Sequence, residues 1–86
     1  MHKWIAQIRV KIYTMKDFDM KVLAERIKEL RLRKSMTTLA LGVSIGTDSG
    51  SISRWETAKS MPSIYFLFRL AKKYGVSVDY LIGVED

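Results

Sequence analysis

The sequence predicts an all-α fold of five short helices. From residue 17 onward, residues that cap helices alternate with glycines that end them, and the apolar residues between these signals recur at spacings of three and four. The chain has 86 residues, which is enough for one small domain with a single core. We therefore expect a helical domain over residues 17–86, preceded by an arm over residues 1–16.

The first two helices are defined by their caps. Asp17 or Asp19 can cap a helix that runs to about Lys34, and its apolar residues share one face. These apolar residues are Val22, Leu23, Ile27 and Leu30. Thr37 can cap a second, short helix that ends near Gly46, because glycine is a common helix terminator.

Three more helices follow, and each begins at a capping residue. They are expected over residues 48–57, 63–75 and 77–83, and the last of them is a single turn. Their caps are Asp48, Ser63 and Ser77, and the glycines that end the last two are Gly75 and Gly83.

The third expected helix has two different faces. At about 100° per residue, Ile52 and Trp55 fall together and should point inward, whereas small polar residues and one arginine fall on the opposite side. The outward residues are Gly50, Ser53, Arg54 and Thr57, with Ser49 exposed at the amino end. Such a face suits a groove lined with base edges, because Arg can grip guanine at two places and Ser can donate or accept. Taken alone, the pattern fits a solvated surface helix equally well.

Three stretches stand in a characteristic order along the chain: IG at residues 45–46, ISRWE at 52–56 and LAKKYGVS at 70–77. With the sequence around them, from Leu23 to Gly83, they resemble the lambda-repressor-like helix-turn-helix family, also called the XRE or Cro/repressor family. The resemblance covers about 60 of the 86 residues. It implies a five-helix domain whose third helix enters the DNA major groove while the second crosses the phosphate backbone, usually as a two-fold dimer.

The resemblance also implies roles for seven residues. Those at positions where the family reads bases are Ser49, Gly50, Ser53 and Arg54, and those at positions that meet or flank phosphates are Thr38, Asp48 and Lys59. The sequence departs from the family in three ways, since the family often has Gln at Thr38, a small neutral cap at Asp48 and Asn-Gly at Thr57-Ala58. The charge of Asp48 either lowers the affinity for DNA, or the side chain caps its helix and turns away.

Glu56 is expected to pair with Arg31. Glu56 lies about 40° from Ile52 around its helix, close to the buried side. A carboxylate there needs a cation, because its desolvation otherwise costs several kcal/mol. Members of the family with the Glu-Leu-Arg run that ends at Arg31 pair the two helices through these positions. In the alternative, both side chains simply reach solvent.

The fourth expected helix carries more apolar surface than one small core can bury. Its expected inward stripe consists of Ile64, Leu67, Leu70, Ala71 and Tyr74, and the large apolar groups on its other faces are Tyr65, Phe66 and Phe68. Either the arm, a second subunit or a partner protein covers these groups, or they only add to the packing of the core.

The arm has the pattern of a β-strand. Its apolar residues occupy alternate positions against polar ones, and they are Trp4, Ala6, Ile8, Val10 and Ile12. A lone strand needs a neighbour, so we expect antiparallel pairing with the same arm of a second subunit, covering Phe66 or Phe68. A helix that uses Ile5, Ile8 and Ile12, or a disordered leader before a start at Met15 or Met20, are the alternatives.

Composition limits the partners and the chemistry. Lys and Arg outnumber Asp and Glu by 15 to 9, which is compatible with an acidic partner but also with a simple solvated surface. With no cysteine, a single histidine, no glycine-rich phosphate loop and no nucleophile beside a base, we expect no metal, no cofactor and no enzyme. Charges interrupt the first 13 residues, so we expect no signal peptide, no membrane span and a cytoplasmic protein.

Together with the resemblance, these features indicate a sequence-specific regulator of transcription that binds double-stranded DNA. We expect a homodimeric repressor, of the prophage or mobile-element kind, that occupies an operator and excludes polymerase. The alternative is the antitoxin of a toxin pair, which binds a toxin protein and its own promoter. A neighbouring reading frame that encodes a small basic toxin would favour this alternative.

Overall fold

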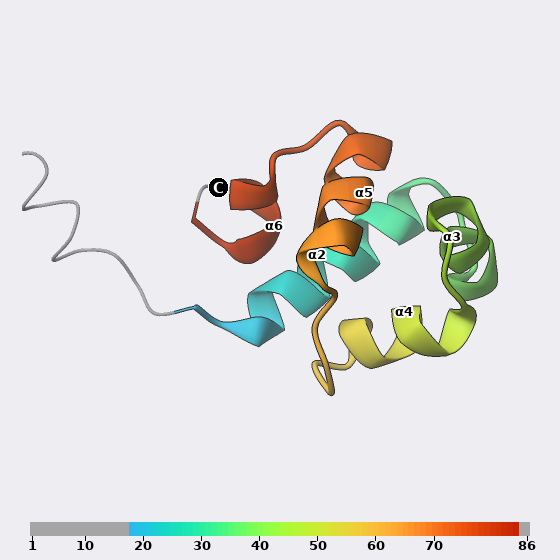
Figure 1. Ribbon diagram of the computed structural model, residues 1–86, viewed down its shortest axis with the longest axis horizontal. Helices are drawn as coiled ribbons and strands as arrows, with labels where there is room; N and C mark the ends of the chain where they lie inside the picture. Colours follow the sequence, from blue (N-terminus) through green and yellow to red (C-terminus); the bar gives the residue numbers. More distant parts are fainter. Residues whose placement is uncertain (1–17, 85–86) are drawn as a thin grey trace, which may run out of the picture.

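The computed structural model describes residues 18–84, and this part of the chain is helical throughout, apart from turns (Figure 1). Helices α2 to α6 span Met20–Arg33, Thr38–Ile45, Ser49–Glu56, Ile64–Tyr74 and Val78–Ile82. The expected all-α fold of five helices is therefore confirmed for residues 18–84. The strand predicted in the arm, and its pairing with a second subunit, lie outside the described residues. None of these five helices has the length and apolar character needed to cross a bilayer.

The helix boundaries follow from the caps that the sequence supplies. In each helix a side-chain oxygen accepts a hydrogen bond from a backbone N–H of the first turn, and the capping residues are Asp19, Thr37, Asp48, Ser63 and Ser77. Of the two candidates for α2, the cap is Asp19, which accepts from the Lys21 N–H at 2.9 Å. The glycines that end α3, α5 and α6 adopt the left-handed backbone conformation, and they are Gly46, Gly75 and Gly83.

Helix α4 ends differently, because an alanine adopts the left-handed conformation after it. Ala58 has φ 57°, and its N–H donates to the Trp55 carbonyl oxygen at 3.3 Å. This conformation brings Cβ close to a carbonyl oxygen and costs an L-residue other than glycine about 1–2 kcal/mol. The turn after α4 is therefore strained at the position where the resemblance leads one to expect glycine.

The core takes at least one large side chain from every helix. The fully buried side chains are Leu23, Ile27, Leu41, Ile45, Ile52, Leu70 and Leu81. Trp55 is also buried, and its ring centroid lies 5.5 Å from that of Phe66 in α5. Helix α4 packs against α3 and α2, and its opposite side is left at the molecular surface (Figure 1).

One expectation for α5 is wrong. Ile64 was expected to point inward, but 83% of it is exposed, whereas Phe66 packs against the core. Ile64 is the first residue of α5, and helical side chains lean toward the amino end of their helix. Its side chain therefore projects beyond the core, and Phe66 takes the place beside Trp55. Tyr65 and Phe68 are each more than half exposed, as the sequence indicated.

Candidate nucleic-acid interface

Helices α3 and α4 are joined by a tight turn that depends on two glycines. Gly46 ends α3 with φ 88°, and the N–H of Thr47 donates to the Gly42 carbonyl oxygen at 2.8 Å. Gly42 lies where the two helices approach, since a Cβ at this position would stand 2.7 Å from the backbone carbonyl carbon of Asp48. The sequence analysis identified Gly46 but missed Gly42. Its signal was a glycine inside a helical pattern, which often marks close packing.

The orientation of α4 about its axis agrees with the pattern of its sequence. Ile52 and Trp55 are buried, and the opposite side of the helix is polar and accessible. Of the four residues expected to read bases, three are exposed and Ser49, at the amino end, is partly buried; the exposed ones are Gly50, Ser53 and Arg54. The fold thus brings all four together on one short helix.

The Arg54 side chain lies over the first turn of α4. Its Nη2 donates to the Ser51 Oγ at 3.2 Å. A Cβ at Gly50 would stand 3.2 Å from the Arg54 Nη1, so the absence of a side chain at Gly50 leaves space for the guanidinium. The guanidinium is held at the amino end of α4 by this exposed and rather long hydrogen bond. Because such a bond is weak, the guanidinium can leave Ser51 for a stronger acceptor.

Asp48 caps α4 through its carboxylate. The Oδ1 atom accepts from the Ser51 N–H at 2.7 Å. This backbone hydrogen bond, followed by the Ser51 side chain, lowers the pKa of Asp48 from its ordinary value of 3.8, and the charge of Arg54 lowers it further. Of the two alternatives for Asp48, the structure supports capping, although the carboxylate stays exposed at the amino end of α4.

The cap predicts a pH dependence of stability. Because folding lowers the pKa of Asp48, its contribution is present above the ordinary value of 3.8 and is lost as the pH falls through the lower folded value. We expect wild-type protein to melt at a higher temperature than Asp48→Ala at pH 7, and the difference to shrink below about pH 4. The Asp48→Asn variant keeps a neutral cap, so its Tm difference from Asp48→Ala should not change with pH. A wild-type advantage over Asp48→Ala that is constant down to pH 2 would contradict a charged cap.

The two remaining residues with an implied phosphate role lie outside α4. Thr38 is the first residue of α3 and is partly buried, and Lys59 is exposed in the turn after α4. The Lys59 N–H donates to the Arg54 carbonyl oxygen at 2.9 Å, which fixes the backbone from which its side chain leaves. In the sequence, Thr38 therefore opens the pair of helices α3 and α4, and Lys59 follows it.

Arg31 and Glu56 form a two-point ion pair between α2 and the end of α4. The Arg31 Nε lies 2.7 Å from the Glu56 Oε2 and its Nη2 lies 2.9 Å from Oε1, with 11% and 6% of the side chains exposed. Arg31 Nη1 also donates to the Met36 carbonyl oxygen at 2.8 Å. The hydrogen bonds to Glu56 raise the pKa of Arg31, so the guanidinium stays charged. Nearby, burial raises the pKa of Tyr74, whose hydroxyl donates to the Met36 sulfur.

Two helices joined by a glycine turn, with the second one polar on its outer side, define a helix-turn-helix unit. Comparison with known proteins agrees, since residues 27–81 match the family model described as helix-turn-helix. The chain belongs to the lambda-repressor-like helix-turn-helix family.

Individual relatives share the same region. The chain is 34% identical over 62 residues to the uncharacterized HTH-type transcriptional regulator YobD of Bacillus subtilis (strain 168), and 29% identical over 62 residues to the HTH-type transcriptional activator BcrR of Enterococcus faecalis. Each match covers 72% of this chain, but only 55% of YobD and 30% of BcrR. The P22 c2 repressor, solved in complex with synthetic operator 9T, matches with a TM-score of 0.69 and 32% identity, over 73% of this chain and 96% of that one.

Proposed function

We propose that this protein is a sequence-specific, DNA-binding regulator of transcription that acts in the cytoplasm as a homodimeric repressor of the prophage or mobile-element kind. The observation that carries the proposal is α4, whose buried Ile52 and Trp55 fix a polar outer face. In the proposed complex this face lies in the major groove of an operator. The likeness to the P22 c2 repressor, which was solved with an operator, supports this arrangement.

Each residue of the interface then has a distinct task. Arg54 reads a guanine edge through its guanidinium, and Gly50 lets the helix backbone approach the groove. Ser49 and Ser53 donate to or accept from base edges, depending on the partner atom. Thr38, at the start of α3, and Lys59, in the turn after α4, contact phosphates, and Asp48 caps α4. The residues to which the resemblance gives a role all lie on α3, on α4 or in the turns next to α4, so one interface can include all of them.

The sharpest test compares a base-reading residue with a phosphate contact. We expect Arg54→Ala to lose about 1–3 kcal/mol at the operator and to relax the preference at one base pair. Lys59→Ala should weaken binding to all sequences alike and lower the salt dependence, because it releases one counterion fewer. Selection of a site from random DNA, followed by fluorescence anisotropy at several salt concentrations, measures both effects. Equal losses of Arg54→Ala on operator and random DNA would exclude base reading.

Self-association is supported by an exposed apolar patch on α5 and the turn before it. The patch consists of Met61, Ile64, Tyr65 and Phe68, each more than half exposed. Helical spacing places Ile64, Tyr65 and Phe68 on one side of α5, and Met61 lies in the turn before this helix. Contiguous apolar surface of this kind usually marks an interface with another protein, and a second copy of the chain is the partner that a two-fold operator requires.

A charge in this patch should dissociate the dimer. We expect Ile64→Glu to sediment as a monomer at concentrations where wild type is dimeric, and to bind the operator more weakly. Leu32→Glu is the matched control, because Leu32 is 55% exposed but lies on α2. Folding should be unaffected in both variants, since neither side chain belongs to the core. Dimers that persist in Ile64→Glu would place the subunit interface elsewhere.

The same patch is the one observation that favours the second candidate, an antitoxin that covers a toxin protein. The neighbouring reading frame identifies the protein to test. If Ile64→Glu abolishes binding to that gene product but leaves the self-association of the chain unchanged, the antitoxin role is preferred over the repressor dimer.

A further inference from the structure

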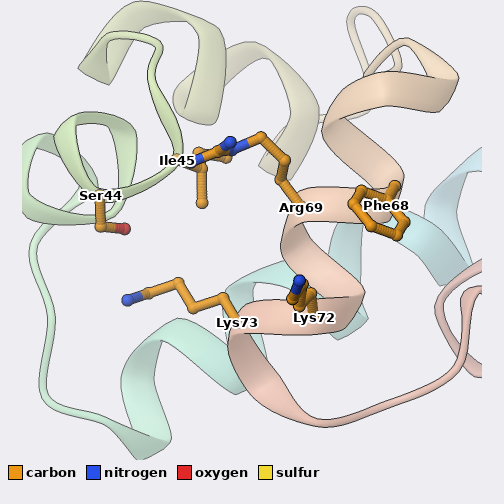
Figure 2. A pocket seen from close by; sticks show the side chains of 6 residues that line it. All are labelled: Ser44, Ile45, Phe68, Arg69, Lys72 and Lys73. Atoms are coloured by element: carbon orange, nitrogen blue, oxygen red, sulfur yellow. The ribbon is translucent and has the colours of Figure 1, made fainter.

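A pocket with a strongly positive lining lies between α3 and α5, on elements other than α4. Its lining residues are Ser44, Ile45, Phe68, Arg69, Lys72 and Lys73. Figure 2 shows Lys73 extended toward Ser44, Arg69 reaching toward Ile45, and Phe68 beside Arg69 on the edge of α5 that is farther from Ser44. The volume is about 290 Å³, just below the range of about 300–1,000 Å³ for small-molecule pockets. A compact ligand therefore fits this pocket.

The three lining cations have no acidic partner within residues 18–84. Both ion pairs of this region lie elsewhere, between Arg31 and Glu56 and between Arg33 and Glu29. The lysine ammonium groups face aromatic rings at the outer limit of a cation–π contact: Lys72 Nζ lies 5.8 Å from the Phe68 ring centroid and Lys73 Nζ lies 5.9 Å from that of Tyr74. Three like charges around one hollow produce a positive potential that only an anion relieves.

Arg69 has unused hydrogen-bonding capacity beside the pocket. Its Nη1 donates to the Tyr65 hydroxyl oxygen at 3.2 Å, whereas its Nε is buried and makes no hydrogen bond with the described residues. A guanidinium has five N–H donors in a planar fork that matches the oxygens of phosphate and carboxylate. The Arg69 guanidinium therefore keeps N–H donors with which it can bind an oxyanion.

We propose that this pocket binds a small phosphate monoester. The phosphate oxygens accept charge-assisted hydrogen bonds from Arg69, Lys72 and Lys73, and the apolar part of the ester lies on the exposed ring of Phe68. Such a ligand is held by α5 beside Ser44 and Ile45 of α3, and it does not occupy the polar face of α4. The site leaves α4 free, but Phe68 also belongs to the exposed apolar patch of α5, so the ester and a second subunit compete for this ring.

Binding is tested on the full chain by titration calorimetry and thermal melting with phenyl phosphate, and with inorganic phosphate for comparison, at ionic strength held constant with chloride. We expect saturable binding that is tighter for phenyl phosphate, because only the ester uses Phe68. At a ligand concentration equal to Kd, the Tm should rise by about 2–3 °C. The double variant Lys72→Gln/Lys73→Gln should lose at least about tenfold in affinity, because two charge-assisted bonds are removed.

The matched control is Lys21→Gln/Lys28→Gln, which removes the same charge from exposed positions on α2 and should bind phenyl phosphate as wild type does. All four lysines are exposed, so circular dichroism should report folded protein in both cases. Equal loss of affinity in the two double variants would overturn the proposal in favour of general attraction by net charge. The absence of saturable binding up to about 10 mM would also overturn it, since a Kd of 10 mM corresponds to a binding free energy of only about −2.7 kcal/mol. A third outcome would also overturn the proposal, namely that neither phosphate compound binds while Lys72→Gln/Lys73→Gln lowers the slope of log K for DNA against log salt concentration by about two. These lysines would then contact the DNA backbone.

Discussion

Replacing Arg31 by Met is expected to lower the free energy of unfolding by about 3–5 kcal/mol. The Glu56 carboxylate is 6% exposed and takes both of its close contacts from Arg31, so the variant leaves a charge with neither water nor a partner. Glu56→Gln should be similarly damaging, because it strands the guanidinium. Since the free energy of unfolding of small domains is only about 5–15 kcal/mol, either change should leave a measurable unfolded fraction at growth temperature. Urea denaturation followed by circular dichroism measures both.

The chain contains its own control for this pair. Glu29 and Arg33 also form an ion pair, at 3.8 Å, but both side chains are more than half exposed. Removing it with Glu29→Gln should cost less than about 0.5 kcal/mol, as exposed pairs four residues apart usually do. A double-mutant cycle on Arg31 and Glu56 should return a large coupling energy. A coupling near zero would mean that the contact contributes nothing specific.

Replacing Gly42 by Ala is expected to destabilise the fold by about 1–3 kcal/mol, the usual cost of overpacking. The new Cβ would stand 2.7 Å from the Asp48 carbonyl carbon and 2.8 Å from its oxygen. These are backbone atoms, so no side chain can rotate out of the way, and α3 and α4 must separate. Thermal melting gives the loss of stability. Operator binding should fall further than stability alone explains, because the amino end of α4 moves.

Gly50 is the matched control for Gly42. It is also a helical glycine, but a Cβ there meets only side-chain ends, the Arg54 Nη1 at 3.2 Å and the Asp48 Oδ1 at 3.4 Å. Gly50→Ala should therefore be neutral or more stable than wild type, by up to about 1 kcal/mol from helix propensity. If the two alanine variants lose the same stability, close approach of α3 and α4 is not the reason for Gly42.

Local chemistry made most of the fold predictable. A residue such as Ser77 caps a helix by a bond within its own first turn, so its effect can be read without knowing any tertiary contact. The side-chain positions of α5 were less predictable, because periodicity assigns Ile64 and Phe66 to faces but does not say where the core ends along the helix. Trp55, which is distant in the sequence, decides that Phe66 is covered and Ile64 is not.

The candidate site divides in the same way. The outward direction of Ser53 and Arg54 follows from counting residues around α4, and the structure has them exposed. The role of Gly42 could not be found by counting, because it depends on the distance between two helices. Similarly, the pocket beside Lys72 and Lys73 requires α5 to lie against α3, and a stretch of sequence does not contain that information.

The alanine that follows α4 has a consequence for how the protein can evolve. Ala58 holds a backbone conformation that glycine adopts without cost, and alanine and glycine codons differ at a single base. One point mutation can therefore return about 1 kcal/mol of stability without touching the core or the outer face of α4. An increment of this size offsets a typical destabilising substitution. Lineages that acquire glycine at this position therefore have more stability in reserve when changes at Ser53 or Arg54 alter the recognised sequence.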